Sequence, residues 1–325
     1  MTAEGIARQP SATPRPTTAK PSHPPVVRVG SPTEARNPRS RDLDLMTTHE
    51  VLRVINAEDS GVPAAVAGVL DRIAAAVELA VTALRAGHRV HYFGAGTSGR
   101  MAVLDAAELP PTYNAPQDWF CSHLAGGREA MWRAVEDAED DEEGGAQEAA
   151  SCVRPGDLAV GLAASGRTPY VLGALRTART VGAHTVLISG NPHAPAANDV
   201  DVFIGVDTGP EVVTGSTRMK AATAQKLVLN SFSTAVMVRL GRVYSNFMVD
   251  LVATNAKLRG RMISILVEAT GYDEETCKAA VAQAGGDLKV ALVSLLSGSS
   301  WAEARSALER SGHRVRDAVA LLTQG

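Results

Sequence analysis

The sequence predicts an α/β protein in which one parallel β-sheet is covered by helices on both faces. Short apolar runs alternate along the chain with segments whose apolar residues recur at helical spacing. The runs stay apolar throughout, as strands do when both faces of a sheet are covered. Two of them end in loops rich in Gly, Ser and Thr. In such folds these loops gather at the carboxyl edge of the sheet, where ligands bind.

Composition excludes several classes of partner. The 325 residues are 45% hydrophobic with a formal net charge of −3, so the chain can bury a large core but has no general attraction to nucleic acid or anionic lipid. Cys121, Cys152 and Cys277 lie far apart without metal-ligand spacing, so neither a disulfide framework nor a structural zinc site is expected. Without a spanning apolar stretch or a signal-peptide pattern, we expect a cytoplasmic protein without membrane contact.

The chain divides into three predicted regions. Residues 1–40 hold roughly half of the 17 prolines among Ser, Thr and Arg, a composition that favours a disordered tail. Residues 41–260 carry the alternating strands and helices. Residues 261–325 show short helical segments with Gly-Asp and Gly-Ser breaks and no strands, which predicts a separate small helical bundle.

Two helices open the main domain. The stretch "EVLRVINAEDSGVPAAVAGVLDRIAAAVELAVTALRAG" shows helical spacing with a break near Gly61 and Val62. Pro63 suits the first turn of the second helix, and Gly87 suits its end. The following "RVHYFGAG" predicts a short strand that reaches a glycine loop.

The strand and loop lead into a helix, and the unit then repeats. We expect the helix "MAVLDAAE" to stop before Pro110 and Pro111, because proline lacks an N–H group and clashes with the preceding turn. "GDLAVGLAASGRTPYVLGALRTARTVGAHTVLISGNP" predicts strand, loop, helix and strand. "VDVFIGVDTGPEV" predicts a further buried strand, and "STRMKAATAQKLVLNSFSTAVMVRLG" a long helix with one apolar face.

The two loops have the chemistry of an anion site. "GAGTSGR" (94–100) and "ASGRTPY" (164–170) each follow a strand and open a helix, so backbone N–H groups and hydroxyls converge at a positive helix end. The first matches a dinucleotide fingerprint superficially, but the acidic residue that binds ribose is not evident, and neither loop has the lysine of a Walker motif. One such loop also fits a tight turn. Two with hydroxyls in matching places indicate a sugar-phosphate site.

Several motifs together resemble a known family. The pair of loops resembles the sugar isomerase (SIS) domain, and "GPEVVTGSTRMKAATAQK" resembles the loop and helix that close the sugar pocket in that superfamily. With "GAGTSGRMAVLDAAELPPTY", "LAGGREAMWRAVEDAEDDEEGG" and "NFMVDLVATNAKL", the chain from about Glu34 to its C-terminus resembles the N-acetylmuramic acid 6-phosphate etherases. The resemblance implies a three-layer SIS-type parallel sheet with a small C-terminal helical domain of UBA-like shape.

The resemblance also implies a reaction. These etherases are lyases that cleave the lactyl ether of N-acetylmuramic acid 6-phosphate to D-lactate and N-acetylglucosamine 6-phosphate, without cofactor or metal, in cell-wall sugar recycling. The implied route is elimination from the ring-opened aldehyde. A base removes the C2 proton, an acid protonates the departing ether oxygen at C3, and water then adds. Two carboxyl groups in different environments suffice for these steps.

Glu108 is the candidate acid. We expect it in the last turn of its helix, at the negative end of the dipole and among Leu104, Leu109 and Pro110. Both effects favour the uncharged carboxylic acid that a departing ether oxygen needs, and the resemblance implies the same role. Taken alone, the pattern also fits an exposed glutamate at a helix end.

The candidate base lies in "AVEDAEDDEEGG". An acidic run is typical of a solvated helix face, and consecutive acids on a helix do not converge on one metal ion. On a helix from about Glu129, with Trp132 and Val135 on its buried side, Glu139 follows Val135 by four residues and lies beside the apolar stripe. The resemblance implies Glu139 as the base, with Glu136 as the alternative.

Hydroxyl and acidic side chains complete the predicted pocket. The residues expected to bind the phosphate and sugar hydroxyls are Thr97, Ser98, Ser165, Thr168, Glu211 and Ser216. Arg100, Arg167 and Lys220 are candidates for neutralising the phosphate, although each equally fits a surface or interface cation. The resemblance further implies a homodimer with residues of both chains near each pocket. Two alternatives stay open: a non-catalytic sugar-phosphate-sensing regulator, which needs neither Glu108 nor Glu139, and an aldose-ketose isomerase.

Overall fold

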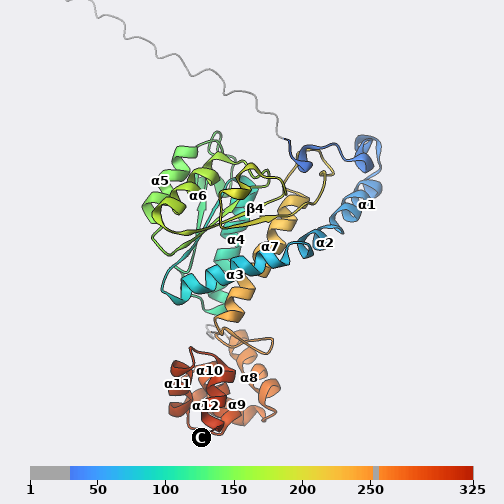
Figure 1. Cartoon of the computed structure of the whole chain (residues 1–325). Coiled ribbons are helices and arrows are strands. Elements are labelled where there is room, and N and C mark those ends of the chain that lie inside the picture. Colours follow the sequence, from blue (N-terminus) through green and yellow to red (C-terminus); the bar gives the residue numbers. More distant parts are fainter. Residues whose placement is uncertain (1–29, 252–255, 325) are drawn as a thin grey trace, which may run out of the picture. The chain divides into compact units, whose positions relative to one another are not determined.

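The computed structural model describes residues 30–251 and 256–324 and confirms the predicted α/β architecture. Five parallel strands form one sheet in the order β2-β1-β3-β4-β5 (Figure 1). The strands are β1 (Val90–Gly94), β2 (Phe120–Leu124), β3 (Leu158–Leu162), β4 (His184–Ser189) and β5 (Val202–Gly205). The sequence analysis did not single out β2, because this edge strand has polar residues in its half-buried middle.

Helices cover both faces of the sheet, as predicted (Figure 1). One face carries α3 (Leu70–Arg85), α4 (Gly96–Tyr113) and α7 (Lys220–Arg239), and the other carries α5 (Glu142–Cys152) and α6 (Pro169–Val181). Along β1, Val90 and Tyr92 enter the core beneath α3, α4 and α7, whereas Phe93 enters the core beneath α5 and α6. Every residue of β1 and β3 is buried. The apolar runs in the sequence therefore correspond to strands that are covered on both faces, as expected.

The strand order determines where a ligand can bind. Strand β1 pairs in parallel with both β2 and β3. The chain therefore adds β2 on one side of β1 and then β3, β4 and β5 on the other side. The crevice at such a reversal, beyond the carboxyl ends of the strands, is the ligand site of open α/β sheets. The two Ser/Gly/Thr loops follow β1 and β3 and therefore meet at this crevice.

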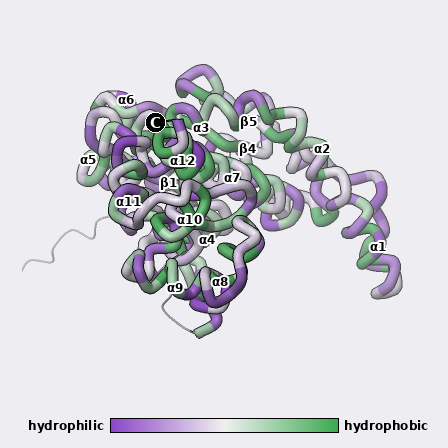
Figure 2. The backbone as a smooth tube through the Cα atoms, turned by 90° about the horizontal axis from the view of Figure 1, so that it is seen from below, coloured by the Kyte–Doolittle hydropathy of each residue, from purple (hydrophilic) through white to green (hydrophobic). Residues whose placement is uncertain are grey.

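The N-terminal helices are more broken than predicted. Helix α1 (Thr48–Asp59) begins with a capping box, and α2 (Val62–Ala67) follows the expected break at Gly61. A second break at Gly68 separates α2 from α3, because glycine is a poor helix former. The expected second helix is thus two helices. In Figure 2, hydrophilic and hydrophobic residues are intermixed along α1, and none of its residues is buried.

The predicted proline-rich tail does not extend to residue 40. Residues 1–29 lie outside the described residues, but residues 31–40 contain two 3-10 helices, each with a proline at its start. The carbonyl of Thr33 and the side chain of Asn37 each form a hydrogen bond of 3.1 Å to the loop 210–215. These long-range contacts, which composition does not reveal, attach residues 31–40 to the main domain.

Helix α4 runs through the two prolines at which the sequence predicts a stop. Pro110 and Pro111 lie inside the helix. Because proline has no N–H group, only two carbonyls of the preceding turn lose their hydrogen-bond donor. Leu109, 4% exposed, anchors this end in the core. The helix ends at Asn114, which adopts a left-handed conformation (φ 49°) and donates its N–H to the Pro110 carbonyl. Glu108 is therefore not in the last turn.

The C-terminal residues form a helical part with its own core, as predicted. Its helices are α8 (Ala256–Thr270), α9 (Glu274–Gln283), α10 (Leu288–Ser297), α11 (Trp301–Arg310) and α12 (Val315–Thr323). A short antiparallel ribbon, β6 (Val243–Tyr244) and β7 (Phe247–Met248), precedes them. The predicted boundary at residue 261 falls inside α8, so sequence composition locates this boundary only approximately.

Surface and hydropathy add two observations. Within residues 30–251 and 256–324 no single helix has the length and apolarity to cross a membrane; α9 and α10 meet that criterion only as a pair bent by 118°. Residues 288–293 of α10 are all buried in the helical part, and all of them except Lys289 are apolar.

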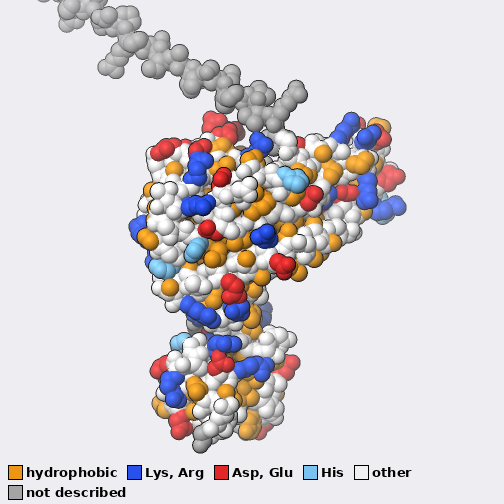
Figure 3. All heavy atoms as spheres, in the orientation of Figure 1, with side chains coloured by type: hydrophobic (Ala, Val, Ile, Leu, Met, Phe, Trp, Pro, Cys, Tyr) orange, Lys and Arg blue, Asp and Glu red, His pale blue; other side chains and the backbone are white. Residues whose placement is uncertain are grey.

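Acidic and basic side chains are interspersed on the face of the molecule shown in Figure 3.

The backbone at the end of β1 approaches the first turn of α4 so closely that residue 94 must be glycine. A Cβ atom on Gly94 would lie 2.7 Å from the Cα atom of Gly99, so Gly94→Ala should force the strand end away from α4. We expect this substitution to lower the free energy of unfolding by about 1–3 kcal/mol, measured by urea denaturation. At the control position Gly61 the φ is negative, and a Cβ atom would meet only the Glu58 carbonyl oxygen, at an ordinary contact distance of 3.6 Å. Gly61→Ala should therefore change the free energy of unfolding by less than about 0.5 kcal/mol. Equal denaturation midpoints for the two variants would contradict the close approach.

Candidate functional site

The predicted anion loops lie at two helix N-termini. Helix α4 starts two residues after β1, and Thr97 and Ser98 lie in its first turn, half-buried and 9% exposed respectively. Helix α6 starts after the loop 163–168, with Thr168 as its N-cap residue. Because β1 and β3 are neighbours, the positive ends of both helices border the same crevice. The arrangement predicted from the two loops is therefore present.

The second loop carries most of the polar contacts. The Arg167 N–H donates to Ser165 Oγ at 3.2 Å, and Asn191 Nδ2 donates to the Ser165 carbonyl at 3.3 Å. Arg167 Nε is buried and has no hydrogen-bond partner among the described residues. A buried guanidinium donor beside a hydroxyl loop is a suitable partner for a phosphate oxygen.

Thr168 connects this loop to the candidate base. Its hydroxyl, on a residue only 5% exposed, donates to Glu139 Oε1 at 3.0 Å. The backbone carbonyl of Glu139 also accepts the Tyr170 N–H at 3.1 Å. Two hydrogen bonds therefore hold Glu139 against the first turn of α6, at the rim of the anion loop. Among the described residues, no acidic residue of the run 136–143 other than Glu139 forms a hydrogen bond with the Thr168 side chain.

The helix predicted around Glu129 is wrong. A short 3-10 helix (Gly127–Met131) is followed by turns, and α5 begins only at Glu142, capped by Asp141. Trp132, expected on a buried face, is 80% exposed. Positive φ values at Gly126, Gly127 and Asp137 interrupt the helix, and a continuous helix would align many like charges. The acids instead gather before and in the first turn of α5, where the helix dipole favours them.

Tertiary contacts hold this acidic segment in place. Arg100, in the second turn of α4, donates from Nε to the Ala130 carbonyl at 2.9 Å and from a terminal nitrogen to the Arg133 carbonyl at 3.2 Å. Arg100 therefore binds protein backbone rather than standing free for a phosphate. Sequence periodicity placed Glu139 beside an apolar stripe, whereas the structure positions it through α4 and α6.

Glu108 lies apart from these groups in the single chain. It is exposed, and its neighbour Leu104 on the same helix face is 42% exposed, so the predicted apolar surroundings are absent from one chain. Among the described residues Glu108 has no hydrogen bond or ion pair. Its position in α4 is about 18 Å along the helix from Gly96, at 1.5 Å per residue.

Glu211 is fully buried and caps α7. Its two carboxylate oxygens accept the N–H groups of Lys220 at 3.0 Å and Ala221 at 2.9 Å. Burial raises the pKa of Glu211, and these two donors oppose the rise. The Lys220 ammonium is itself buried and donates to Glu58 Oε2 at 2.6 Å. Both side chains thus hold the fold together, and Ser216 lies half-buried in the loop between them.

Sequence reasoning missed two buried polar residues at the same edge. Ser189, the last residue of β4, and Asn191, two residues after it, are each 1% exposed. The Asn191 N–H donates to Ser189 Oγ at 3.0 Å, and Ser189 Oγ donates to the Ala164 carbonyl at 3.3 Å. Together they fix the loop 163–168 from the neighbouring strand. The "SGNP" turn after a buried strand was a signal that could have located them.

Comparison with known proteins agrees with this geometry. The chain matches the family model described as the SIS domain over residues 135–235, and the one described as the glucokinase regulatory protein N-terminal SIS domain over residues 72–179. The fold and the two hydroxyl loops thus define a protein of the SIS class, a parallel α/β domain with helix N-termini at the crevice beside β1 and β3.

Similarity over most of the chain is more specific. Proteins named N-acetylmuramic acid 6-phosphate etherase are 60% identical in Thermobifida fusca (84% of this chain, 90% of that protein), 52% in Symbiobacterium thermophilum (82% and 89%) and 50% in Pectobacterium atrosepticum (88% and 95%). The chain belongs to the N-acetylmuramic acid 6-phosphate etherase family. The regulatory alternative is accordingly not favoured.

The hydrogen bonds between Glu211 and the start of α7 predict that this residue stabilises the fold. Glu211→Ala removes both acceptors from buried N–H groups, so we expect the free energy of unfolding to fall by about 1–3 kcal/mol per group left unpaired. Thermal and urea unfolding measure the change, with Glu309→Ala on an exposed face of α11 as the control. Unchanged stability in Glu211→Ala would contradict the capping role.

Proposed function

We propose that this protein is a carbon-oxygen lyase that cleaves the lactyl ether of N-acetylmuramic acid 6-phosphate. The products would be N-acetylglucosamine 6-phosphate and D-lactate. Family membership supports the substrate and the reaction. The observation that carries the proposal is the hydrogen bond from Thr168 to Glu139, which holds a carboxylate at the rim of the anion loop. The reaction would serve cell-wall sugar recycling in the cytoplasm.

The phosphate is assigned to the two helix N-termini. Hydroxyls of the first turn of α4 and of the loop before α6 line the crevice, and they are Thr97, Ser98, Ser165 and Thr168. The unpartnered Arg167 Nε adds a charged donor. Helix N-termini bind anions through free N–H groups and the helix dipole, so the 6-phosphate is the group that this end of the site suits. Ser216 remains a candidate for a sugar hydroxyl.

Glu139 is assigned as the base. In the ring-opened sugar the aldehyde acidifies the C2 proton, and Glu139 would remove it. The Thr168 hydroxyl occupies Oε1, so Oε2 is left to face the sugar. Fixing one carboxylate oxygen orients the other, which is how a positioned base gains its rate advantage.

Glu108 is assigned as the acid that protonates the departing ether oxygen at C3. Loss of lactate leaves an unsaturated aldehyde, to which water adds. Because Glu108 lies about 18 Å along α4 from the loop of its own chain, we propose that a partner subunit supplies it. The partner would also cover Leu104, which would favour the uncharged acid.

Exposed apolar residues support a homodimer. Leu45 and Leu52 are 81% and 60% exposed, and no residue of α1 is buried within the chain. Large apolar side chains on an amphipathic surface helix are typical of an interface. The single chain also separates Glu108 from Glu139, so the pocket is incomplete without a second copy.

The lactate-release assay tests the reaction and both glutamates together. Purified protein incubated with N-acetylmuramic acid 6-phosphate should release D-lactate. Glu108→Gln and Glu139→Gln should each lower kcat by about 10²–10⁴-fold, because a general acid or base contributes that much. The matched control Glu143→Gln, in the same acidic run, should retain activity. Wild-type protein that releases no lactate would refute the function, and a larger loss in Glu136→Gln than in Glu139→Gln would reassign the base.

Heterodimers test whether the two glutamates come from different chains. Glu108→Gln and Glu139→Gln chains carrying different affinity tags are co-expressed, and the mixed dimer is purified. If the partner supplies Glu108, one of its two pockets is intact, and we expect about half of wild-type activity. If both glutamates belong to one chain, both pockets are damaged and activity stays at the level of the single variants. A fully active monomer in sedimentation would also contradict the shared pocket.

A further inference from the structure

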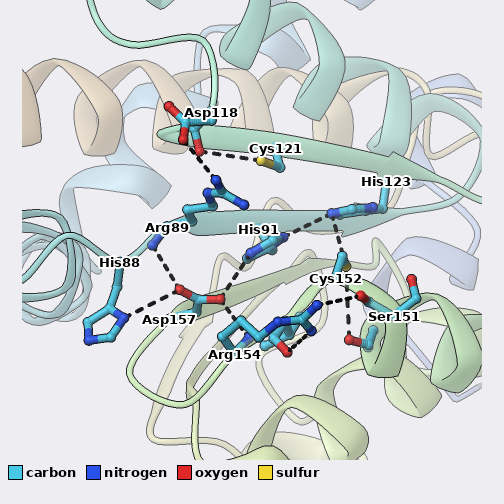
Figure 4. A network of polar contacts seen from close by, with 12 residues as sticks. His88, Arg89, His91, Asp118, Cys121, His123, Ser151, Cys152, Arg154 and Asp157 are labelled. Carbon is cyan, nitrogen blue, oxygen red and sulfur yellow. Dashed lines mark hydrogen bonds and ion pairs between the residues drawn. The ribbon is translucent and has the colours of Figure 1, made fainter.

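A buried polar cluster lies on the sheet face covered by α5 and α6. His91 of β1 and His123 of β2 point toward each other, and Cys152 at the end of α5 points toward both (Figure 4). His91 Nδ1 lies 3.0 Å from His123 Nε2, which lies 3.6 Å from Cys152 Sγ. All three atoms lie within 4.8 Å of one another. His91 is 1% exposed, and the His123 side chain is 13% exposed.

We propose that His91 Nδ1, His123 Nε2 and Cys152 Sγ bind a zinc ion that joins β1, β2 and α5. Zinc–nitrogen bonds of about 2.0–2.1 Å and zinc–sulfur bonds of about 2.3 Å place tetrahedral ligands about 3.3 Å apart for two nitrogens and about 3.6 Å for nitrogen and sulfur. The observed separations are close to both values. Three protein ligands leave one tetrahedral position for a water molecule.

The surroundings have the form of a second coordination shell. The remaining nitrogen of each histidine lies near a carboxylate. His123 Nδ1 forms a hydrogen bond of 3.0 Å with Glu148 Oε1, and His91 Nε2 lies 3.3 Å from Asp157 Oδ2 without hydrogen-bond geometry. Carboxylates in this position fix the tautomer and raise the basicity of a histidine ligand. A bond of 2.6 Å from the Tyr170 hydroxyl holds Glu148.

Asp157 is held equally firmly. It is 2% exposed and accepts the N–H groups of Arg89 at 2.9 Å and Arg154 at 2.7 Å. In the described structure, the titratable groups in contact with the three ligand side chains are therefore two carboxylates, each with its own fixed donors. Zinc with one thiolate and two neutral imidazoles has a net charge of +1, which these carboxylates offset.

The cluster shares no residue with the proposed catalytic site. His91 precedes Gly94, the carboxyl end of β1, by about 10 Å of strand, at 3.3 Å per residue, whereas His123 lies one residue before the end of β2. His91 and His123 are 32 residues apart in the chain, and His123 and Cys152 are 29 residues apart. A sequence motif with short ligand spacing therefore does not indicate this site. The ion would link β1 and β2 to α5, which begins just after the segment that carries Glu139.

Metal titration of the full-length protein without a polyhistidine tag tests the proposal. After chelation and dialysis, calorimetry should show one Zn²⁺ bound per chain, and Co²⁺ should give an intense thiolate-to-cobalt absorption band. Zn²⁺ at 100 times its Kd should raise the free energy of unfolding by about 2.7 kcal/mol. No stoichiometric binding of either ion would overturn the proposal, whatever the behaviour of the variants.

Variants assign the ligands. Cys152→Ser should abolish the cobalt band, and Glu148→Gln should weaken Zn²⁺ binding by about 10–100-fold. The matched control Cys121→Ser, on the same strand as His123 but outside the ligand set, should retain the band. A band that survives in Cys152→Ser, or is lost in Cys121→Ser, would overturn the assignment. Circular dichroism of each variant verifies that the comparison is between folded proteins.

Discussion

Strands β1 and β3 pair in parallel from Val90 opposite Leu158 to Gly94 opposite Leu162, and the rest of the site depends on this pairing. It places the ends of two strands side by side, so that the helices that follow them begin at one crevice. Neither loop alone presents more than the N–H groups of one helix end. Together they present two positive ends with hydroxyls between them. The direction of the strands, more than any single side chain, creates the anion site.

The acidic segment before α5 depends on that crevice for its position. It has no helix of its own, and its contacts come from Arg100 on one side and from Thr168 and Tyr170 on the other. The N-terminal turns of α4 and α6 therefore do two things: they supply donors for an anion and they hold Glu139 beside it. In this arrangement, fixed hydrogen-bond donors would offset the repulsion between the Glu139 carboxylate and a phosphate bound at the proposed site.

The sheet separates two kinds of chemistry. Its carboxyl edge carries hydroxyls and helix ends suited to a phosphorylated sugar. The face beneath α5 and α6 carries His91, His123 and Cys152. Alternation along β1 sends His91 to this face while Tyr92 enters the opposite core. The same alternation that makes the strand apolar on one side thus allows a buried polar cluster on the other.

The sequence alone determined the parallel α/β class, the two anion loops and the helical C-terminal part, because periodicity and Gly/Ser/Thr loops are local signals. The resemblance to the etherases implied Glu139 as the base, and the helix expected to carry it does not form. Tertiary structure decided what local pattern cannot: that α4 continues through Pro110, that Glu211 caps α7 and that Glu108 stands apart from Glu139 in one chain. It also brought together three metal-binding side chains from separate elements. Each of these outcomes depends on contacts between residues far apart in the chain, and no local pattern encodes such a contact.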